Sequence, residues 1–179
     1  MNCRITLICA AAPSRPVFPS DEAAAPAALA RVAPLAAGRA VCVTSPLRRA
    51  RQTAAALGLD AAVEPALRET GFGTWAGQEV EAVLAADPAG FAAWRADPAA
   101  APPGGESFAA MAARVAGWLE AQAGGAREVL AITHPGPIQA ALLHVLGAPA
   151  ALASRIGVRP LSRICLSHDG RRWSLLIGA

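Results

Sequence analysis

The sequence predicts an α/β domain of three layers (α/β/α), with a central, mostly parallel sheet between helices. Two observations lead to this fold class. Short runs of apolar and β-branched residues alternate with longer Ala-rich helical stretches, which is typical of parallel strands joined by helices. Near the end of the chain, two strand-like runs flank Asp169-Gly170, a hairpin signal that places an antiparallel pair at the sheet edge. The length of 179 residues suits a single domain, residues 1–179.

The first half of the chain alternates between strand and helix patterns. Residues 4–10 (RITLICA) and 39–45 (RAVCVTS) are short apolar runs that predict strands. The stretch from Asp21 to Ala37 is Ala-rich and predicts a helix, which Pro26 and Pro34 weaken or segment. The other elements expected in this half are a helix over 46–58, an extended stretch over 61–69 and a glycine-rich bend over 70–77.

The second half continues the alternation. Residues 79–97 predict one or two helices with a break around Asp87-Pro88. Ser107 can accept a hydrogen bond at the start of a long helix over 108–123, which a pair of glycines ends. The remaining elements are a loop over 98–105, a strand over 127–134, a PGP segment over 135–137, a helix over 138–147 and the C-terminal hairpin over 162–178.

Composition excludes several classes of function. All 16 basic residues are arginines, scattered rather than clustered with aromatic residues, so no nucleic-acid partner is expected. The net charge of +3 fits an anionic substrate, or a compositional bias of the genome. None of the four cysteines has zinc-site spacing, so we expect a reduced, cytoplasmic protein without metal or organic cofactor. No apolar run is long enough for a membrane span, and the apolar N-terminal stretch fits a strand better than a signal peptide.

Polar side chains follow three of the predicted strands. Residues 44–45 come after the second strand and precede Arg49 and two further arginines, Glu69 precedes the glycine-rich bend, and His134 ends the strand over 127–134. The C-terminal ends of parallel strands lie along one edge of a sheet, where ligands usually bind. A helix N-terminus with guanidinium groups suits a phosphate. Each residue alone could equally be structural: a solvated arginine, a loop-capping glutamate, a packed histidine.

Four segments, in the same order along the chain, resemble the histidine phosphatase superfamily, which has the phosphoglycerate mutase-like fold. The similarity is greatest to its small phosphatases of the α-ribazole phosphatase type, and it extends over nearly the whole chain. The segments are VTSPLRRARQTAAAL (43–57), LRETGFGTWAGQEV (67–80), PPGGESFAAMAARV (102–115) and VLAITHPGPIQAALLHVLG (129–147).

The resemblance implies a role for three residues. In the family, an Arg-His-Gly triplet follows the first strand, and its histidine is phosphorylated during turnover. The triplet's arginine, a second arginine and a second histidine bind the phosphate, and an acidic residue protonates the leaving oxygen. On this pattern Arg49 is the second arginine, Glu69 is the acid and His134 is the second histidine.

The triplet itself is replaced. Cys9, Ala10 and Ala11 stand where the family has Arg-His-Gly, so the nucleophile and one charged phosphate ligand are absent. Pro135 also removes a backbone N–H beside His134. We therefore predict a degenerate, catalytically impaired member that retains a pocket for inorganic phosphate or a phosphorylated small molecule.

Two alternatives stay open at this stage. One is an active phosphomonoester hydrolase with an unusual mechanism. It would use the C-x5-R spacing of Cys9 and Arg15, or water attack with Glu69 as acid or base. Arg15 is also a candidate to replace the lost positive charge. The other alternative is a protein-interaction module with a vestigial pocket. The sequence leaves the ligand and the oligomeric state open, a homodimer included.

In the family, substrates are selected by the C-terminal tail and by the region around residues 79–105. Here it is rich in Ala and Pro, and Trp75, Phe91 and Trp94 are its candidate wall residues. These aromatic side chains could instead pack the helical region against itself, and packing is the interpretation we favour.

Overall fold

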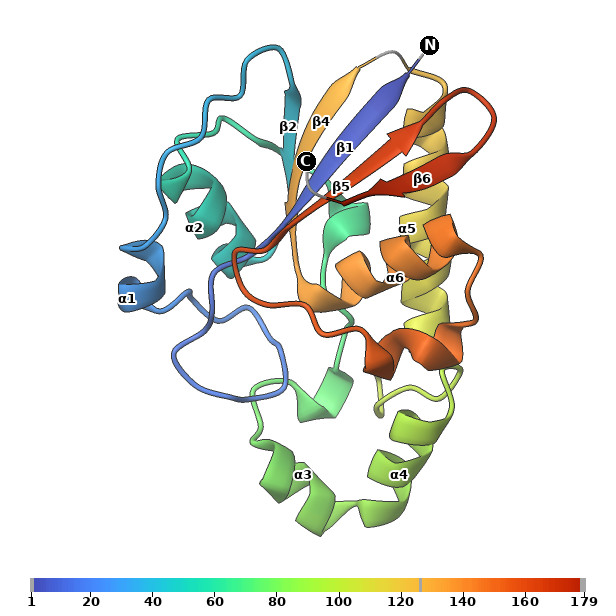
Figure 1. Ribbon diagram of the computed structural model, residues 1–179. Coiled ribbons are helices and arrows are strands. Elements are labelled where there is room, and N and C mark those ends of the chain that lie inside the picture. The colour runs from blue at the N-terminus through green and yellow to red at the C-terminus, as the bar shows by residue number, and fades with distance from the viewer. Residues whose placement is uncertain (1, 126, 178–179) are drawn as a thin grey trace.

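A six-stranded mixed sheet with helices on both faces forms the centre of the computed structural model, which describes residues 2–125 and 127–177 (Figure 1). The strand order is β3-β2-β4-β1-β5-β6; β1 to β4 run parallel to one another, β5 is antiparallel to β1, and β6 at the edge is antiparallel to β5. The predicted fold class is confirmed. The strands are β1 (Cys3–Cys9), β2 (Val41–Thr44), β3 (Ala62–Val63), β4 (Glu128–Thr133), β5 (Arg163–His168) and β6 (Trp173–Leu176).

The helices pack on two apolar clusters, one on each face of β1. Ile5 and Leu7 belong to the larger cluster, with side chains of α5 and α6, and Ile8 belongs to the smaller one, with side chains of α2. Alternation of side chains along the strand accounts for this division. The helices are α1 (Pro26–Leu29), α2 (Arg48–Ala56), α3 (Val80–Ala86), α4 (Pro88–Ala96), α5 (Phe108–Ala123) and α6 (Pro135–Leu146), with short 3-10 helices η1 (Pro65–Leu67), η2 (Gly73–Trp75) and η3 (Ala150–Arg155). In the part of the chain described, no helix is long and apolar enough to cross a membrane.

The helix predicted over 21–37 is wrong for most of its length. Only the four residues of α1 are α-helical, beginning at Pro26. Pro34 cannot donate a backbone hydrogen bond, and its ring disfavours a helical conformation in the residue before it. The remaining segment crosses the surface as a loop, which the hydrogen bond from the Leu35 N–H to the Leu57 carbonyl oxygen (2.9 Å) fastens to the end of α2.

The capping signals of the second half are confirmed. The Ser107 hydroxyl oxygen accepts the Ala110 N–H at 3.1 Å, and α5 runs over the predicted residues. The break at Asp87 separates α3 from α4, and the Asp87 carboxylate accepts the Gly90 N–H at 2.8 Å. The predicted C-terminal hairpin is β5 and β6, with Gly170 at a φ of 95° in the turn. η3 was not predicted.

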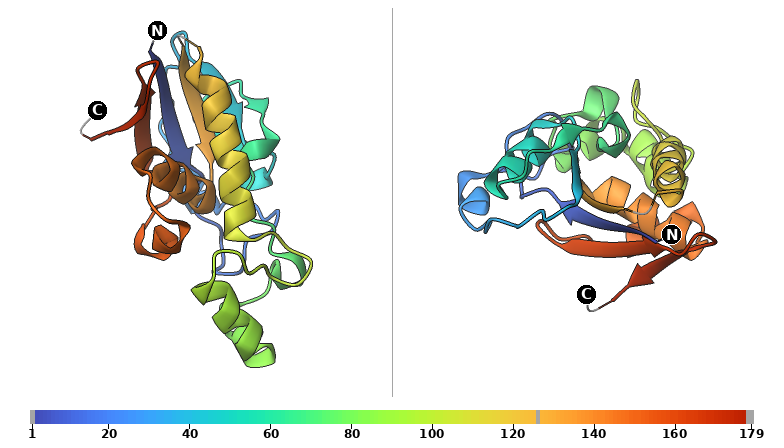
Figure 2. Two further views of the ribbon diagram at one scale, coloured as in Figure 1. Left: turned by 90° about the vertical axis from the view of Figure 1, so that its right-hand side faces the viewer. Right: turned by 90° about the horizontal axis from the view of Figure 1, so that it is seen from above.

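A separate aromatic cluster lies beyond the C-terminal ends of the parallel strands. Figure 1 shows α3 and α4 below the sheet, and Figure 2 shows them set apart from the layer that contains α5. We call this region, residues 79–97, the cap. It packs its aromatic side chains on the loop after β1 and on the glycine-rich bend. The cluster consists of Phe18, Phe72, Trp75, Val83, Phe91 and Trp94.

The glycine-rich bend contacts the loop before α5 backbone to backbone. The Thr74 N–H donates to the Pro103 carbonyl oxygen at 3.0 Å, and the Glu106 N–H donates to the Gly71 carbonyl oxygen at 2.7 Å. Gly73 has a φ of +51°, and a Cβ atom there would collide with the Pro103 carbonyl oxygen. Only glycine permits both this conformation and this approach.

Gly73→Ala should therefore lower the free energy of unfolding by about 3 kcal/mol or more. Gly104→Ala is a matched control, because Gly104 also has a positive φ but a Cβ atom there meets nothing within 4 Å. The control should cost only about 1 kcal/mol, the price of a left-handed alanine. Urea unfolding measures the free energy of unfolding of both variants. Equal losses of stability would show that the close contact with the Pro103 carbonyl oxygen does not constrain Gly73.

Candidate functional site

The predicted edge of the sheet brings Ser45, Arg49 and His134 together. Ser45 follows β2 and His134 follows β4, and these strands are neighbours in the sheet. His134 Nε2 lies 2.8 Å from Ser45 Oγ, and Arg49 Nη2 lies 3.4 Å from His134 Nδ1. His134 and Ser45 are fully buried, and Arg49 is only 6% exposed. We call these three residues the Arg–His cluster.

The hydrogen bonds of the Arg–His cluster fix the state of His134. A guanidinium group has only donors, so Nδ1 must accept from Arg49 and the ring proton must be on Nε2. Nε2–H then donates to Ser45 Oγ. Burial, and next the positive charges of Arg49 and Arg114, lower the pKa of His134 to about 3. The ring is therefore neutral at physiological pH.

Glu69 follows η1 and lies against the start of α6, which His134 directly precedes. Its Oε1 accepts the Thr70 N–H at 2.9 Å, and its Oε2 accepts the Gly136 N–H, at the start of α6, at 3.2 Å. A side chain on Gly136 would collide with Glu69 Oε1, which explains the glycine of the PGP segment. Burial raises the pKa of Glu69, against the opposing effects of the two N–H groups and the nearby arginines. A buried carboxyl with a raised pKa can act as a proton donor.

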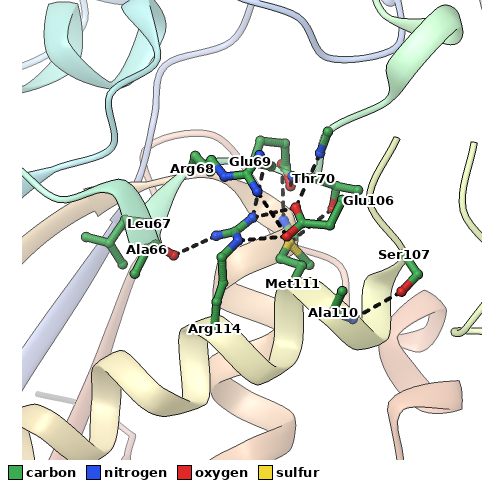
Figure 3. Close-up of polar contacts among 12 residues, drawn as sticks. Ala66, Leu67, Arg68, Glu69, Thr70, Glu106, Ser107, Ala110, Met111 and Arg114 are labelled. Atoms are coloured by element: carbon green, nitrogen blue, oxygen red, sulfur yellow. Dashed lines mark hydrogen bonds and ion pairs between the residues drawn. The ribbon is translucent and has the colours of Figure 1, made fainter. Parts of the chain in front are cut away.

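An ion-pair network supports the backbone of Glu69 from below (Figure 3). Arg114 on α5 donates to the Glu106 carboxylate at 2.9 and 2.8 Å, to the Ala66 carbonyl oxygen at 2.6 Å and to the Glu69 carbonyl oxygen at 3.4 Å. Arg68 adds a second ion pair to Glu106 at 3.2 Å. Burial opposes ionisation of Glu106, but its hydrogen bond and charge contact with Arg114 lower its pKa overall. Sequence analysis missed this network.

Sequence analysis also missed Glu22, which faces Arg49. Glu22 Oε1 lies 3.4 Å from Arg49 Nε, and Glu22 Oε2 accepts the Ser20 N–H at 2.7 Å. The adjacent Asp21 accepts the Arg48 N–H at 2.6 Å, so two carboxylates cover the N-terminus of α2. Within the described residues, Arg49 Nε nevertheless has no hydrogen-bond partner. One buried donor of Arg49 is thus left for another acceptor.

The segment after β1 meets the Arg–His cluster through its backbone. The Ala10 N–H donates to the Thr133 carbonyl oxygen at 2.7 Å, and the Ala11 carbonyl oxygen accepts from Arg49 Nη1 at 3.4 Å. The Ala11 N–H donates to Thr53 Oγ1 at 2.9 Å. Ala10 and Ala11 are fully buried, and their methyl groups can neither attack nor ionise. Thr53, four residues after Arg49 on α2, could have been found from its helical spacing.

Cys9 and Arg15 do not form a cysteine-phosphatase loop. The Arg15 side chain is 72% exposed and pairs with Glu79 at 2.7 Å, and no contact with the Arg–His cluster is found within the described residues. Cys9 is fully buried, and burial raises the pKa of its thiol to about 12. The thiol therefore stays protonated at neutral pH, which removes the nucleophilic form.

A pocket of about 540 Å³ opens next to Glu69. It lies between the cap, the start of α6 and η3, and Pro135 and Gly136 line it directly after His134. Phe91 and Trp94 line this pocket, as the wall hypothesis requires, and they also pack in the aromatic cluster, as does Trp75. Over the ranges 2–125 and 127–177, no group of three potential metal ligands gathers.

A sheet of this topology, with helices on both faces, has the phosphoglycerate mutase-like architecture. The sequence profile of the histidine phosphatase superfamily (branch 1) matches residues 20–177, and the chain belongs to this family. The match begins at residue 20, so it leaves out β1 and the segment after it that contains Ala10 and Ala11.

Curated relatives are mycobacterial. The bifunctional protein Rv2228c of Mycobacterium tuberculosis H37Rv is 36% identical over 125 residues, which cover 66% of this chain and 34% of that protein. Glucosyl-3-phosphoglycerate phosphatase of Mycolicibacterium vanbaalenii is 38% identical over 120 residues, covering 60% of this chain and 53% of that protein. The chain thus spans a third to a half of the length of these relatives.

Solved structures agree with this placement. Mycobacterial glucosyl-3-phosphoglycerate phosphatase Rv2419c in complex with VO3 has a TM-score of 0.80 at 28% identity, covering 97% of both chains. Its complex with inorganic phosphate has a TM-score of 0.75 at 30% identity, covering 97% of this chain and 95% of that one. A putative α-ribazole-5'-P phosphatase from Escherichia coli shares the fold, with a TM-score of 0.85 at 18% identity, covering 98% of this chain and 95% of that one.

The neutral state of His134 predicts a pH-dependent loss of stability. Its pKa is about 3 in the folded chain against 6.5 for an unperturbed histidine, so its contribution is complete above pH 6.5 and is lost as the pH falls. Between pH 5.5 and 4, the wild type should lose about 1.4 kcal/mol per pH unit more than His134→Gln. Urea unfolding at several pH values measures the difference. Equal slopes for the wild type and His134→Gln would contradict the assignment.

Proposed function

We propose that this chain is a degenerate histidine phosphatase that binds inorganic phosphate or a phosphorylated small molecule at the Arg–His cluster without normal phosphoryl transfer. One observation carries the proposal. Ala10 is buried where the resemblance expects the nucleophilic histidine, while Arg49 and His134 lie within 3.4 Å of each other at the adjacent strand ends. The family match that begins only at residue 20 is consistent with this replacement.

The Arg–His cluster has the donors that a phosphate requires. Arg49 carries a permanent charge, and its buried Nε–H has no hydrogen-bond partner within the described residues. The Nε2–H of His134 and the Ser45 hydroxyl, which can rotate, are the further donors of the cluster. The phosphate and vanadate complexes of the mycobacterial phosphatase support binding of such anions in this family.

The same geometry opposes turnover. Covalent catalysis needs a nucleophile in line with the phosphorus atom, and Ala10 supplies only a methyl group. The Cys9 thiol, with a pKa of about 12, stays protonated. Direct attack by water would need a general base, whereas the raised pKa of Glu69 suits a proton donor. Loss of the catalytic nucleophile lowers turnover by roughly 10⁶-fold in a serine protease.

Release of p-nitrophenol from p-nitrophenyl phosphate between pH 5 and 8 tests this prediction. The wild type should show no turnover above that of Glu69→Gln or His134→Gln, because none of the three has a nucleophile. Wild-type turnover that disappears in both variants would contradict the proposal. It would favour the active hydrolase that the sequence left open.

Glu22 should compete with phosphate for Arg49. Its carboxylate occupies the side of Arg49 that carries the unbonded Nε–H, and only 19% of its side chain is exposed. Two negative groups cannot share this position without repulsion. Binding of an anion therefore requires Glu22 to move away.

Glu22→Gln should bind inorganic phosphate roughly 3- to 10-fold more tightly than the wild type, since about 1 kcal/mol of repulsion is removed. Isothermal titration calorimetry measures the affinity. Glu79→Gln is the matched control, because Glu79 pairs with the exposed Arg15 instead, and it should not change the affinity. Arg49→Gln should abolish binding. Absence of phosphate binding in every protein would contradict the proposal and favour an interaction role.

A further inference from the structure

The pocket beside Glu69 has a rigid aromatic wall. Trp94 lies at the centre of that wall, with ring centroids 5.5 Å from Phe18, 6.0 Å from Phe72 and 5.7 Å from Phe91. Each contact is tilted or edge-to-face, the arrangement that aromatic pairs prefer. The rings are therefore held in place before any ligand enters. The opposite wall is also apolar, formed by Phe108 on α5 and three alanines of η3.

Most polar side chains of the pocket already have partners. The Glu69 carboxylate accepts two backbone N–H groups. The Thr70 hydroxyl donates to Met111 Sδ at 3.0 Å, and the Gln139 amide nitrogen donates to the Ile156 carbonyl oxygen at 2.7 Å.

The other polar lining groups are the exposed Arg95 and Ser154, the amide oxygen of Gln139 and the indole N–H of Trp94. Within the described residues, no carboxylate pairs with Arg95. The charged and hydroxyl groups without a partner therefore lie at exposed positions of the pocket, whereas most of its wall consists of rings and methyl groups.

This distribution of polar groups discriminates between ligands. A sugar would bury several hydroxyl groups against rings and methyl groups, and each hydroxyl without a partner costs about 1–3 kcal/mol in general. An apolar body would displace water from the same walls without leaving polar groups unsatisfied. The pocket thus differs from what the sugar of glucosyl-3-phosphoglycerate, named for the mycobacterial relative, would need.

We infer that the pocket accepts the organic part of a phosphate monoester whose body is aromatic or otherwise apolar, rather than a sugar. The inference rests on the proposed function only for the binding of the phosphoryl group of the ligand. Glu69 lines the pocket and accepts the Gly136 N–H, and Pro135 and Gly136, which also line it, directly follow His134, so a ligand seated between the cap and η3 borders the Arg–His cluster. The apolar body lies against Trp94, and the phosphoryl group extends past Glu69 towards Arg49.

Three ligands separate the contribution of the organic body to the binding affinity from that of the anionic group. Naphthylmethylphosphonate carries an aromatic body and cannot be hydrolysed, methylphosphonate carries the same anion without the ring, and glucose 6-phosphate carries a sugar. By calorimetry, naphthylmethylphosphonate should bind at least about tenfold more tightly than either of the others, from burial of its ring. Equal affinities for naphthylmethylphosphonate and glucose 6-phosphate would overturn the inference.

Two variants place the ring in the pocket. Trp94→Ala removes the central wall residue, and Ala153→Phe fills the space from η3 without removing a ring. Each should reduce the preference for naphthylmethylphosphonate over methylphosphonate to about threefold or less and leave methylphosphonate affinity unchanged. Trp173→Ala on β6 is the control for loss of a tryptophan and should keep the full preference. A preference that survives in both pocket variants would overturn the inference.

Binding of 2-naphthol distinguishes failure of this inference from failure of the proposed function. If neither phosphonate nor inorganic phosphate binds, but 2-naphthol binds and both pocket variants weaken it, the apolar pocket stands and the phosphate function fails. If methylphosphonate binds but the ring adds no affinity, the phosphate function stands and the apolar pocket fails.

Discussion

The contact between Arg49 and His134 is the interaction on which the rest of this site depends. A buried guanidinium needs polar or charged partners, and each partner here, by hydrogen bond or ion pair, comes from a different part of the fold. His134 is delivered by the end of β4, the Ala11 carbonyl oxygen by the segment after β1, and Glu22 by the loop before α1. Because β4 lies between β1 and β2, the sheet order sets these distances. Burial of the ring, and next the charge of Arg49, lower the pKa of His134 and keep it neutral.

Under our proposal, the chain combines a preserved set of donors with a missing reactive group. Arg49, Ser45 and His134 would bind an anion, and Glu69 would hold a proton next to it. The position expected to attack is a methyl group inside the smaller apolar cluster. Binding depends on donors already held in place, whereas transfer also depends on one atom with a reactive lone pair. A family member can therefore lose the second property and keep the first, which is the relation we propose for this protein.

Much of this arrangement could be predicted from sequence. The ends of the predicted strands indicated where Arg49, Glu69 and His134 would lie, because the C-terminal ends of parallel strands meet at one edge of the sheet. Ser107 indicated where α5 begins. The roles of Glu22 and Arg114 could not be predicted, because Glu22 lies 27 residues before Arg49, and Arg114 lies 45 and 48 residues after the Glu69 and Ala66 carbonyl oxygens that it contacts. The prediction of a helix over 21–37 was wrong because it gave more weight to the alanines of this segment than to its two prolines. In the structure the prolines decide, and only four residues are helical.

A crystal structure with bound vanadate tests the central claim most directly. Vanadate adopts a five-coordinate geometry when a side-chain nucleophile bonds to it, and it stays tetrahedral when it is held only by hydrogen bonds and charge. Our account predicts a tetrahedral vanadate bound to Arg49 and the Nε2–H of His134, facing Ala10, with no bond to any protein atom. Five-coordinate vanadate bonded to Cys9 or His134, or vanadate bound away from Arg49, would contradict it.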